Sequence, residues 1–130
     1  MKRLLLILAS IVCCPEELLA ESNTQYVRLT KAMVINYGEP SLSRLKYLKV
    51  AVDVRVPSAS AADLVEYHRP ALLDALVTVF TDSEAEVVKS SHGKEEIRQH
   101  ALAQLQRVMT SEEGDQIIED LLFGTFVVQR

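Results

Sequence analysis

The sequence is poor in cysteine, and both cysteines lie close to the N-terminus. Cys13 and Cys14 are the only two in 130 residues, so a domain that begins after them needs neither a disulfide nor a thiolate-bound metal. Basic residues are outnumbered by acidic ones, because 14 lysines and arginines stand against 18 aspartates and glutamates, for a formal net charge of −4. A mildly acidic chain without a basic cluster is a poor match for nucleic acid, and we predict no such partner.

Motifs for catalysis and ligand binding are equally scarce. The glycines are isolated from one another, so no loop is available to cradle a phosphate. Ser91 and His92 are neighbours, but nothing in the sequence supplies a third group to orient them. His68, His92 and His100 follow neither the HxH nor the HExxH spacing of metal sites. We therefore predict a protein that is not an enzyme and that has no catalytic, metal or cofactor site.

The longest apolar run is too short to span a bilayer. Residues 4–14 would cover about 16 Å of a hydrocarbon core about 30 Å thick. Lys2 and Arg3 precede the run, Pro15 ends it, and Ala20 offers a small residue at a cleavage point. This order predicts that residues 1–20 are a secretory signal peptide. An uncleaved membrane anchor is the competing interpretation, and a lipoprotein modified at one of the two cysteines is the third.

The rest of the chain, residues 21–130, is expected to form one domain that starts with a β-hairpin. Hydrophobic residues alternate with polar ones over 48–56, which is typical of a strand with one buried face. A second β-rich stretch at 26–35 precedes it, and residues 36–40 contain the turn formers asparagine, glycine and proline. Because the connection is short, the two strands are predicted to be antiparallel. Residues 121–129 are predicted to add a C-terminal strand.

Between the hairpin and the last strand the pattern becomes helical. Ser60 and Asp63 resemble a capping box at the start of a first helix. Pro70 lacks an N–H group, so it is expected to end that helix and begin the next. The second helix has an apolar face at helical spacing, formed by Leu72, Leu73, Leu76, Val77 and Phe80.

Two further helices are predicted after residue 80. Thr81 and Glu84 offer a cap for a short helix that ends near residue 89, and residues 90–93 then interrupt the chain. Residues 94–109 form the best amphipathic pattern, and a polar loop follows at 110–115. Since helices and sheet each need a partner for an apolar face, the prediction is an α+β fold in which helices cover a small antiparallel sheet.

Four short motifs occur in a recognisable order. They are VIN at 34–36, HRPALLDALV at 68–77, HGKEEIR at 92–98 and LFGTFVVQ at 122–129. Together they resemble the FliL family of flagellar basal-body-associated stator accessory proteins, and the resemblance covers nearly all of residues 26–129.

The motif residues that we single out are expected to be mainly structural. Asn36 is predicted to turn the chain between strands, Pro70 to set a helix junction and Gly93 to open the long helix. Phe123 and Phe126 are predicted to lie on opposite faces of a strand. The complete set is Asn36, Arg69, Pro70, Gly93, Phe123, Phe126 and Gln129.

The resemblance implies a periplasmic domain similar to stomatin-type folds that forms a homo-oligomer beside the flagellar stator. It further implies binding to stator units and basal body, support of flagellar rotation, swimming or swarming, and no known cofactor. Family members usually carry a cytoplasmic tail and a full transmembrane helix, whereas this chain has only a signal-like segment. Association with the inner membrane is therefore left open, as is a rival role as a non-catalytic periplasmic adaptor of another envelope complex.

Overall fold

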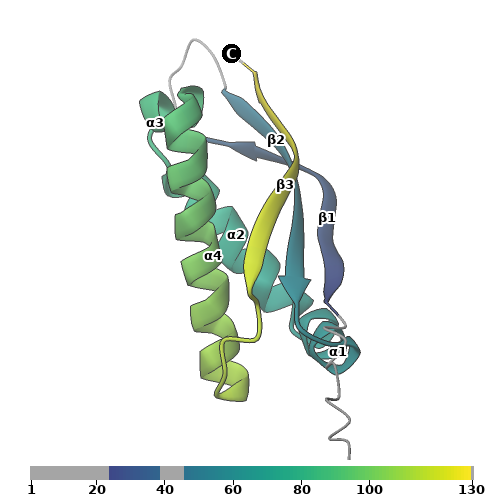
Figure 1. The fold of residues 1–130 in the computed structure, drawn as a ribbon. Helices are drawn as coiled ribbons and strands as arrows, with labels where there is room; N and C mark the ends of the chain where they lie inside the picture. Colours follow the sequence, from purple (N-terminus) through teal and green to yellow (C-terminus); the bar gives the residue numbers. More distant parts are fainter. Residues whose placement is uncertain (1–23, 39–45, 130) are drawn as a thin grey trace, which may run out of the picture.

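The computed structural model describes residues 24–38 and 46–129, and it confirms the α+β fold class. Three strands form one layer, and helices pack on one side of it (Figure 1). In chain order the elements are β1 (Gln25–Asn36), β2 (Tyr47–Val56), α1 (Ala59–Tyr67), α2 (Arg69–Asp82), α3 (Ala85–Lys89), α4 (Ser91–Glu113) and β3 (Asp120–Gln129).

The sheet is antiparallel, with β2 in the centre between β1 and β3. The alternation predicted for β2 is confirmed, because its even-numbered apolar side chains have no exposed surface and face the helices. They are Leu48, Val50, Val52, Val54 and Val56. The hairpin and the C-terminal strand thus form the small sheet that the sequence predicts, and both outer strands are sheet edges.

Each edge strand departs from regular pairing with β2. On β1, the register shifts twice between Arg28 and Met33. On β3, Phe123 pairs with Val52 and Thr125 pairs with Ala51, which leaves Gly124 as an extra residue. Such a bulge changes which side of the sheet the following side chains face.

The start of α1 differs from the prediction. Ser58, rather than Ser60, is the N-cap, and its hydroxyl accepts a hydrogen bond from the Ala61 amide at 3.1 Å. Pro57 follows the end of β2, and Ser58 then has the extended conformation that an N-cap requires, with φ of −157° and ψ of 167°. Pro70 lies in the first turn of α2, as predicted.

Two details of α2 and α3 also differ from the prediction. Thr81 is not a cap, because α2 continues to Asp82 and the N-cap of α3 is Glu84, whose side chain makes no capping bond. Val77 is 41% exposed and Val79 is buried in its place. The observed stripe of Leu72, Leu76, Val79 and Phe80 follows the i, i+4, i+7, i+8 spacing, which excludes position i+5.

Helix α4 is longer at both ends than the predicted 94–109. Its N-cap is Ser90, whose hydroxyl accepts a hydrogen bond from the Gly93 amide at 2.8 Å, so residues 91–93 belong to the first turn and not to a break. At the other end the helix continues through the expected loop to Glu113. Gly114 then ends it in the left-handed conformation, with φ of 78°.

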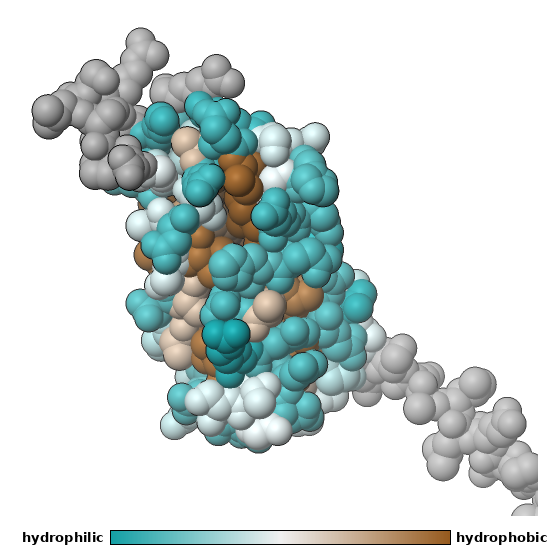
Figure 2. All heavy atoms as spheres, turned by 90° about the vertical axis from the view of Figure 1, so that its left-hand side faces the viewer, coloured by the Kyte–Doolittle hydropathy of each residue, from teal (hydrophilic) through white to brown (hydrophobic). Residues whose placement is uncertain are grey.

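The core lies between the helices and one face of the sheet. Helix α4 contributes one side of this core through Gly93, Ile97, Ala101, Leu105 and Met109. Hydrophilic side chains dominate the helical side of the molecule, and apolar side chains reach its surface only in narrow strips between them (Figure 2). No helix among the described elements covers the opposite face of the sheet.

Candidate functional site

The histidines lie apart from one another and have separate surroundings. His68, at the junction of α1 and α2, has its Nε2 2.6 Å from Oε1 of Glu113 at the end of α4. His92 is exposed in the first turn of α4, next to Ser91, and His100 lies in the middle of the same helix. Within residues 24–38 and 46–129, no three side chains of histidine, cysteine, aspartate or glutamate are placed to hold a metal ion.

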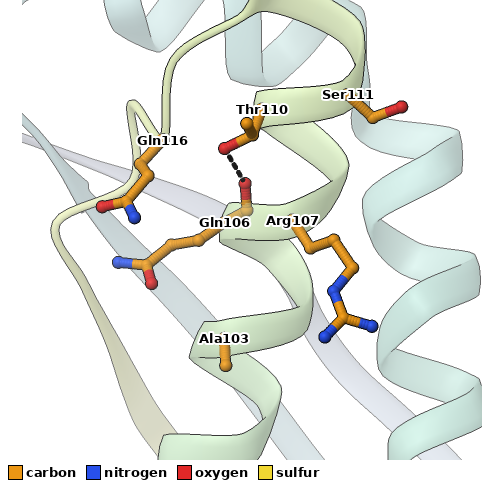
Figure 3. Close-up of a pocket in the computed structure, with 6 residues that line it drawn as sticks. All are labelled: Ala103, Gln106, Arg107, Thr110, Ser111 and Gln116. Atoms are coloured by element: carbon orange, nitrogen blue, oxygen red, sulfur yellow. Dashed lines mark hydrogen bonds between the residues drawn. The ribbon is translucent and has the colours of Figure 1, made fainter.

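A shallow hollow of about 480 Å³ lies along the second half of α4, but its polar groups do not converge (Figure 3). Gln106 and Gln116 lie on one side of the helix, while Arg107 and Ser111 point to the other. The Thr110 hydroxyl donates to the backbone carbonyl of Gln106 at 2.8 Å. A binding site for a small molecule needs several polar groups directed at one point, and this hollow does not supply them.

Arg69 ties the junction of α1 and α2 to strand β1. Its Nη1 donates to the backbone carbonyl of Leu29 at 2.5 Å, and its Nε and Nη2 donate to the Glu66 carboxylate. Leu29 lies where the β1 register shifts. The guanidinium therefore satisfies a backbone acceptor on an irregular sheet edge, which supports a structural role for this motif residue.

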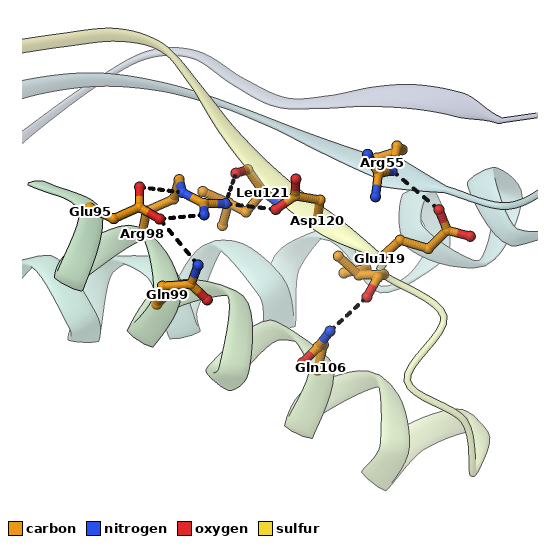
Figure 4. A network of polar contacts seen from close by, with 9 residues as sticks. Arg55, Glu95, Arg98, Gln99, Gln106, Glu119, Asp120 and Leu121 are labelled. Atoms are coloured by element: carbon orange, nitrogen blue, oxygen red, sulfur yellow. Dashed lines mark hydrogen bonds and ion pairs between the residues drawn. The ribbon is translucent and has the colours of Figure 1, made fainter.

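Arg98 makes the corresponding connection between α4 and β3 (Figure 4). Its Nη1 donates to Asp120 Oδ1 at 2.6 Å and to the Leu121 carbonyl at 3.0 Å, while Nε and Nη2 bind Glu95. Hydrogen bonds from Arg98, and then from Gln99, lower the pKa of Glu95 to about 2. The hydrogen bond to Glu95 in turn raises the pKa of Arg98 above its ordinary value. Sequence reasoning found Arg98 only as the last letter of a motif, because its partners on β3 are distant in the chain.

Gly93 allows the start of α4 to pack closely against α3. A Cβ atom at this position would lie 1.8 Å from the carbonyl oxygen of Val87 and 2.6 Å from the hydroxyl of Ser90. Gly93 is buried and is the third residue of α4, so it does not open the helix as predicted. Its role is to leave room for the preceding backbone.

Phe123 and Phe126 lie on the same side of the sheet, so the prediction of opposite faces is wrong. Their ring centroids are 5.0 Å apart, and Phe123 also approaches Phe80 of α2. The Nζ of Lys94 lies 5.3 Å from the centre of the Phe126 ring. The bulge at Gly124 adds one residue between the phenylalanines and so reverses the alternation.

Asn36 does not turn the chain as predicted. It is the last residue of β1 and pairs with Tyr47, which on its other side pairs with Gln129. Gly38 takes the positive φ, at 72°. Glycine adopts such a φ without the steric cost that a side chain would impose, and Gly38 lies beyond the end of β1. The predicted cleavage point, Ala20, lies outside the described residues.

The uncovered face of the sheet and the neighbouring edge of β3 are the candidate interaction surface. In one row across this face, Lys49 of β2 lies between Val34 of β1 and Val127 of β3, which are 62% and 44% exposed. Leu122 of β3 is also exposed. Exposed valines and leucines beside an open strand edge are typical of surfaces that bind protein.

Comparison with known families matches residues 26–129 to the flagellar basal body-associated protein FliL. No curated protein is similar enough to count as a relative. Among the helices in the described part of the chain, none has the length and apolar character needed to cross a bilayer. The matched range includes every described helix and nearly all of the sheet, and the chain belongs to the FliL family of flagellar basal-body-associated proteins.

Proposed function

We propose that this chain is a flagellar motor accessory protein that acts by binding rather than by catalysis. In this proposal it forms a homo-oligomer in the periplasm, contacts stator units at the basal body and supports rotation during swimming or swarming. The observation that carries the proposal is the family match over residues 26–129, which covers the whole sheet except its first residue.

Two features of the domain support a binding role. The polar side chains best placed for chemistry are already used to connect elements, as in the contact of His68 with Glu113 and the contacts of Arg98 with β3. By contrast, the outer face of the sheet leaves Val34, Leu122 and Val127 in solvent. Structural ion pairs combined with an exposed apolar face fit an adaptor better than an enzyme.

The proposal includes export by an N-terminal signal at residues 1–20, followed by release or retention at the inner membrane. Residues 4–14 are apolar and follow Lys2 and Arg3, which is the order of a secretory signal. Either fate places the described domain in the periplasm, where it contacts the stator units.

The test is deletion of the gene in its host, followed by swimming and swarming assays and by purification of the tagged protein with its partners. We expect reduced motility, restored by the wild-type gene, and recovery of stator proteins with the tag. Normal motility together with absence of stator proteins would refute the proposal and favour an adaptor of another envelope complex.

A further inference from the structure

The two edges of the sheet differ in how open they are to another strand. Edge β1 contains two register shifts, carries the exposed cation Lys31, and has the Leu29 carbonyl already bound by Arg69. Bulges, edge lysines and covered backbone groups are the features by which proteins prevent unwanted strand pairing. The β1 edge is therefore protected.

Edge β3 has little of this protection. Arg98 binds the Leu121 carbonyl at the beginning of the strand, but no charged residue follows between Leu122 and Gln129. After the bulge at Gly124, residues 125–129 pair regularly with β2. No other described strand pairs with the outer side of this segment, which is thus an uncharged, regular strand edge of the kind that accepts a further strand.

The core is also incompletely covered along β3. Facing the helices, β1 buries Val27, Leu29 and Ile35, whereas Phe126 and Val128 of β3 are only partly buried. On the other face of β3, Val127 is 44% exposed. A strand added beside β3 would cover apolar side chains on both faces, and this burial would favour binding.

We infer that β3 pairs antiparallel with β3 of a second copy of this chain, in a register centred on Val127. A twofold axis at Val127 places Thr125 opposite Gln129 and Phe126 opposite Val128 of the second copy, which uses the entire regular segment. The β3 edge is then the surface through which the self-association in the proposed function takes place. The pairing rests on that proposed function for its role and on the strand edge for its physical basis.

A second copy suits this edge because a strand that pairs with itself brings each of its charges near a like charge. Residues 121–129 contain none. On the sheet face that no described helix covers, the nearest described cations are Lys49 and its counterpart in the second copy. They are three strand spacings, or about 14 Å, apart. That separation exceeds the Debye length of about 8 Å at physiological ionic strength, so their repulsion is largely screened. Because the β1 edge is protected, the pairing closes as a dimer and does not extend into a fibre.

Cysteine cross-linking of the full chain tests the register. Cys13 and Cys14 are replaced by serine, and a single cysteine is introduced by Val127→Cys, Leu122→Cys or Val34→Cys. On the twofold axis, two Val127 positions have Cβ atoms about 5 Å apart, within reach of a disulfide after a small adjustment. Two Leu122 positions would be about 28 Å apart, since the bulge leaves only four β2 positions between the partners of Leu122 and Val127, and two Val34 positions would be about 24 Å apart. We expect rapid covalent dimer formation from Val127→Cys alone.

Like-charge substitution tests the same contact without a disulfide. Val127→Lys places two ammonium groups opposite each other, and we expect the dimer dissociation constant measured by sedimentation to rise at least about tenfold. Leu122→Lys is the matched control, since Leu122 lies on the same strand and face with 41% exposure, and we expect a change of less than about twofold. Thermal unfolding of both variants checks that they remain folded.

The outcomes separate this inference from the proposed function. Cross-linking that is no faster at Val127 than at Leu122 or Val34 would overturn the β3 pairing. A wild-type protein that stays monomeric at every concentration, or equal effects of the two lysine variants, would also overturn it. Those results would leave the motility assays to decide the proposed function. Conversely, a Val127-centred dimer in a host whose swimming survives deletion would support the pairing and refute the flagellar role.

Discussion

At the scale of single residues, the residue type tolerated at positions 93 and 117 is set by backbone atoms and backbone conformation more than by side-chain contacts. Gly93 is required because the carbonyl of Val87 occupies the place where a side chain would begin. Ile117, between α4 and β3, has φ of 56°, a region that β-branched residues rarely occupy. The Ile118 amide lies 2.5 Å from the Gln116 carbonyl, so Ile117 is the central residue of a tight turn. Neither constraint is visible in composition or periodicity, since both arise from neighbours placed by the fold.

We predict that Gly93→Ala destabilises the domain, although alanine usually stabilises a helix relative to glycine by about 1 kcal/mol. The new Cβ would lie 1.8 Å from a backbone oxygen, and shifting that backbone should cost about 1–3 kcal/mol net. Urea unfolding measures the change. Gly124→Ala is the control, because its Cβ would meet only the Ala51 Cβ at an ordinary 3.6 Å. Equal midpoints for wild type and Gly93→Ala would contradict the packing argument.

Ile117 offers a comparison between two truncations. Ile117→Gly and Ile117→Ala remove nearly the same side chain, but only glycine adopts positive φ without steric cost. We predict that the glycine variant is more stable than the alanine variant by about 1 kcal/mol, the reverse of the usual order. The same pair of substitutions at Ile118, which is buried, controls for loss of packing. An alanine variant at least as stable as the glycine variant would show that Ile117 is not strained.

At the scale of elements, the sequence predicted periodic structure well and its boundaries poorly. The alternation in β2 specified its buried face because the side-chain period of a strand is fixed at two. The start of α4 was missed because Ser91, His92 and Gly93 resemble a loop until Ser90 is seen to cap them. The bulge at Gly124 was also missed, since a bulge is a property of two paired strands.

Among the contacts between elements, the ion pair of Glu95 with Arg98 predicts a pH dependence. The pKa of the Glu95 carboxyl is lowered from 4.5 to about 2 in the folded protein. The stabilisation that this ion pair gives the fold is therefore present above pH 4.5 and is lost as the pH falls toward 2. We expect the melting temperature of Glu95→Gln to vary less than that of the wild type over this range. Glu96→Gln is the control, because Glu96 makes no ion pair with any residue that the structure describes. If the melting temperatures of wild type and Glu95→Gln changed in parallel with pH, the contribution of this ion pair to the pH dependence would be contradicted.

At the scale of the whole molecule, the family and the fold class were predictable while the candidate interaction surface was not. The motifs at 34–36, 68–77, 92–98 and 122–129 indicated the family, which the match over residues 26–129 confirms. The same motifs proved to hold the fold together, with Arg69 and Arg98 each binding a backbone carbonyl of an edge strand. The contrast between the two sheet edges requires the strand order β1-β2-β3, and sequence spacing alone does not give the order of strands in a sheet.

The fate of residues 1–20 also belongs to this scale, and we predict cleavage after Ala20. A signal peptidase requires small residues near the cut, so Ala20→Arg should block processing. Intact mass spectrometry of protein from its host should find a wild-type chain that begins at Glu21 and an Ala20→Arg chain that begins at Met1. Cleavage removes Lys2, Arg3 and two glutamates, and therefore leaves the net charge unchanged at −4.

A control substitution at Ser22, just beyond the cut, should leave processing unaffected, since the preference for small residues applies before the cleaved bond. A wild-type protein that keeps Met1 and sediments with the membrane fraction would contradict cleavage. In that case residues 4–14 hold the chain at the membrane. Because ten extended residues span at most about 35 Å, residues 15–24 would keep the start of β1 within that distance of the bilayer.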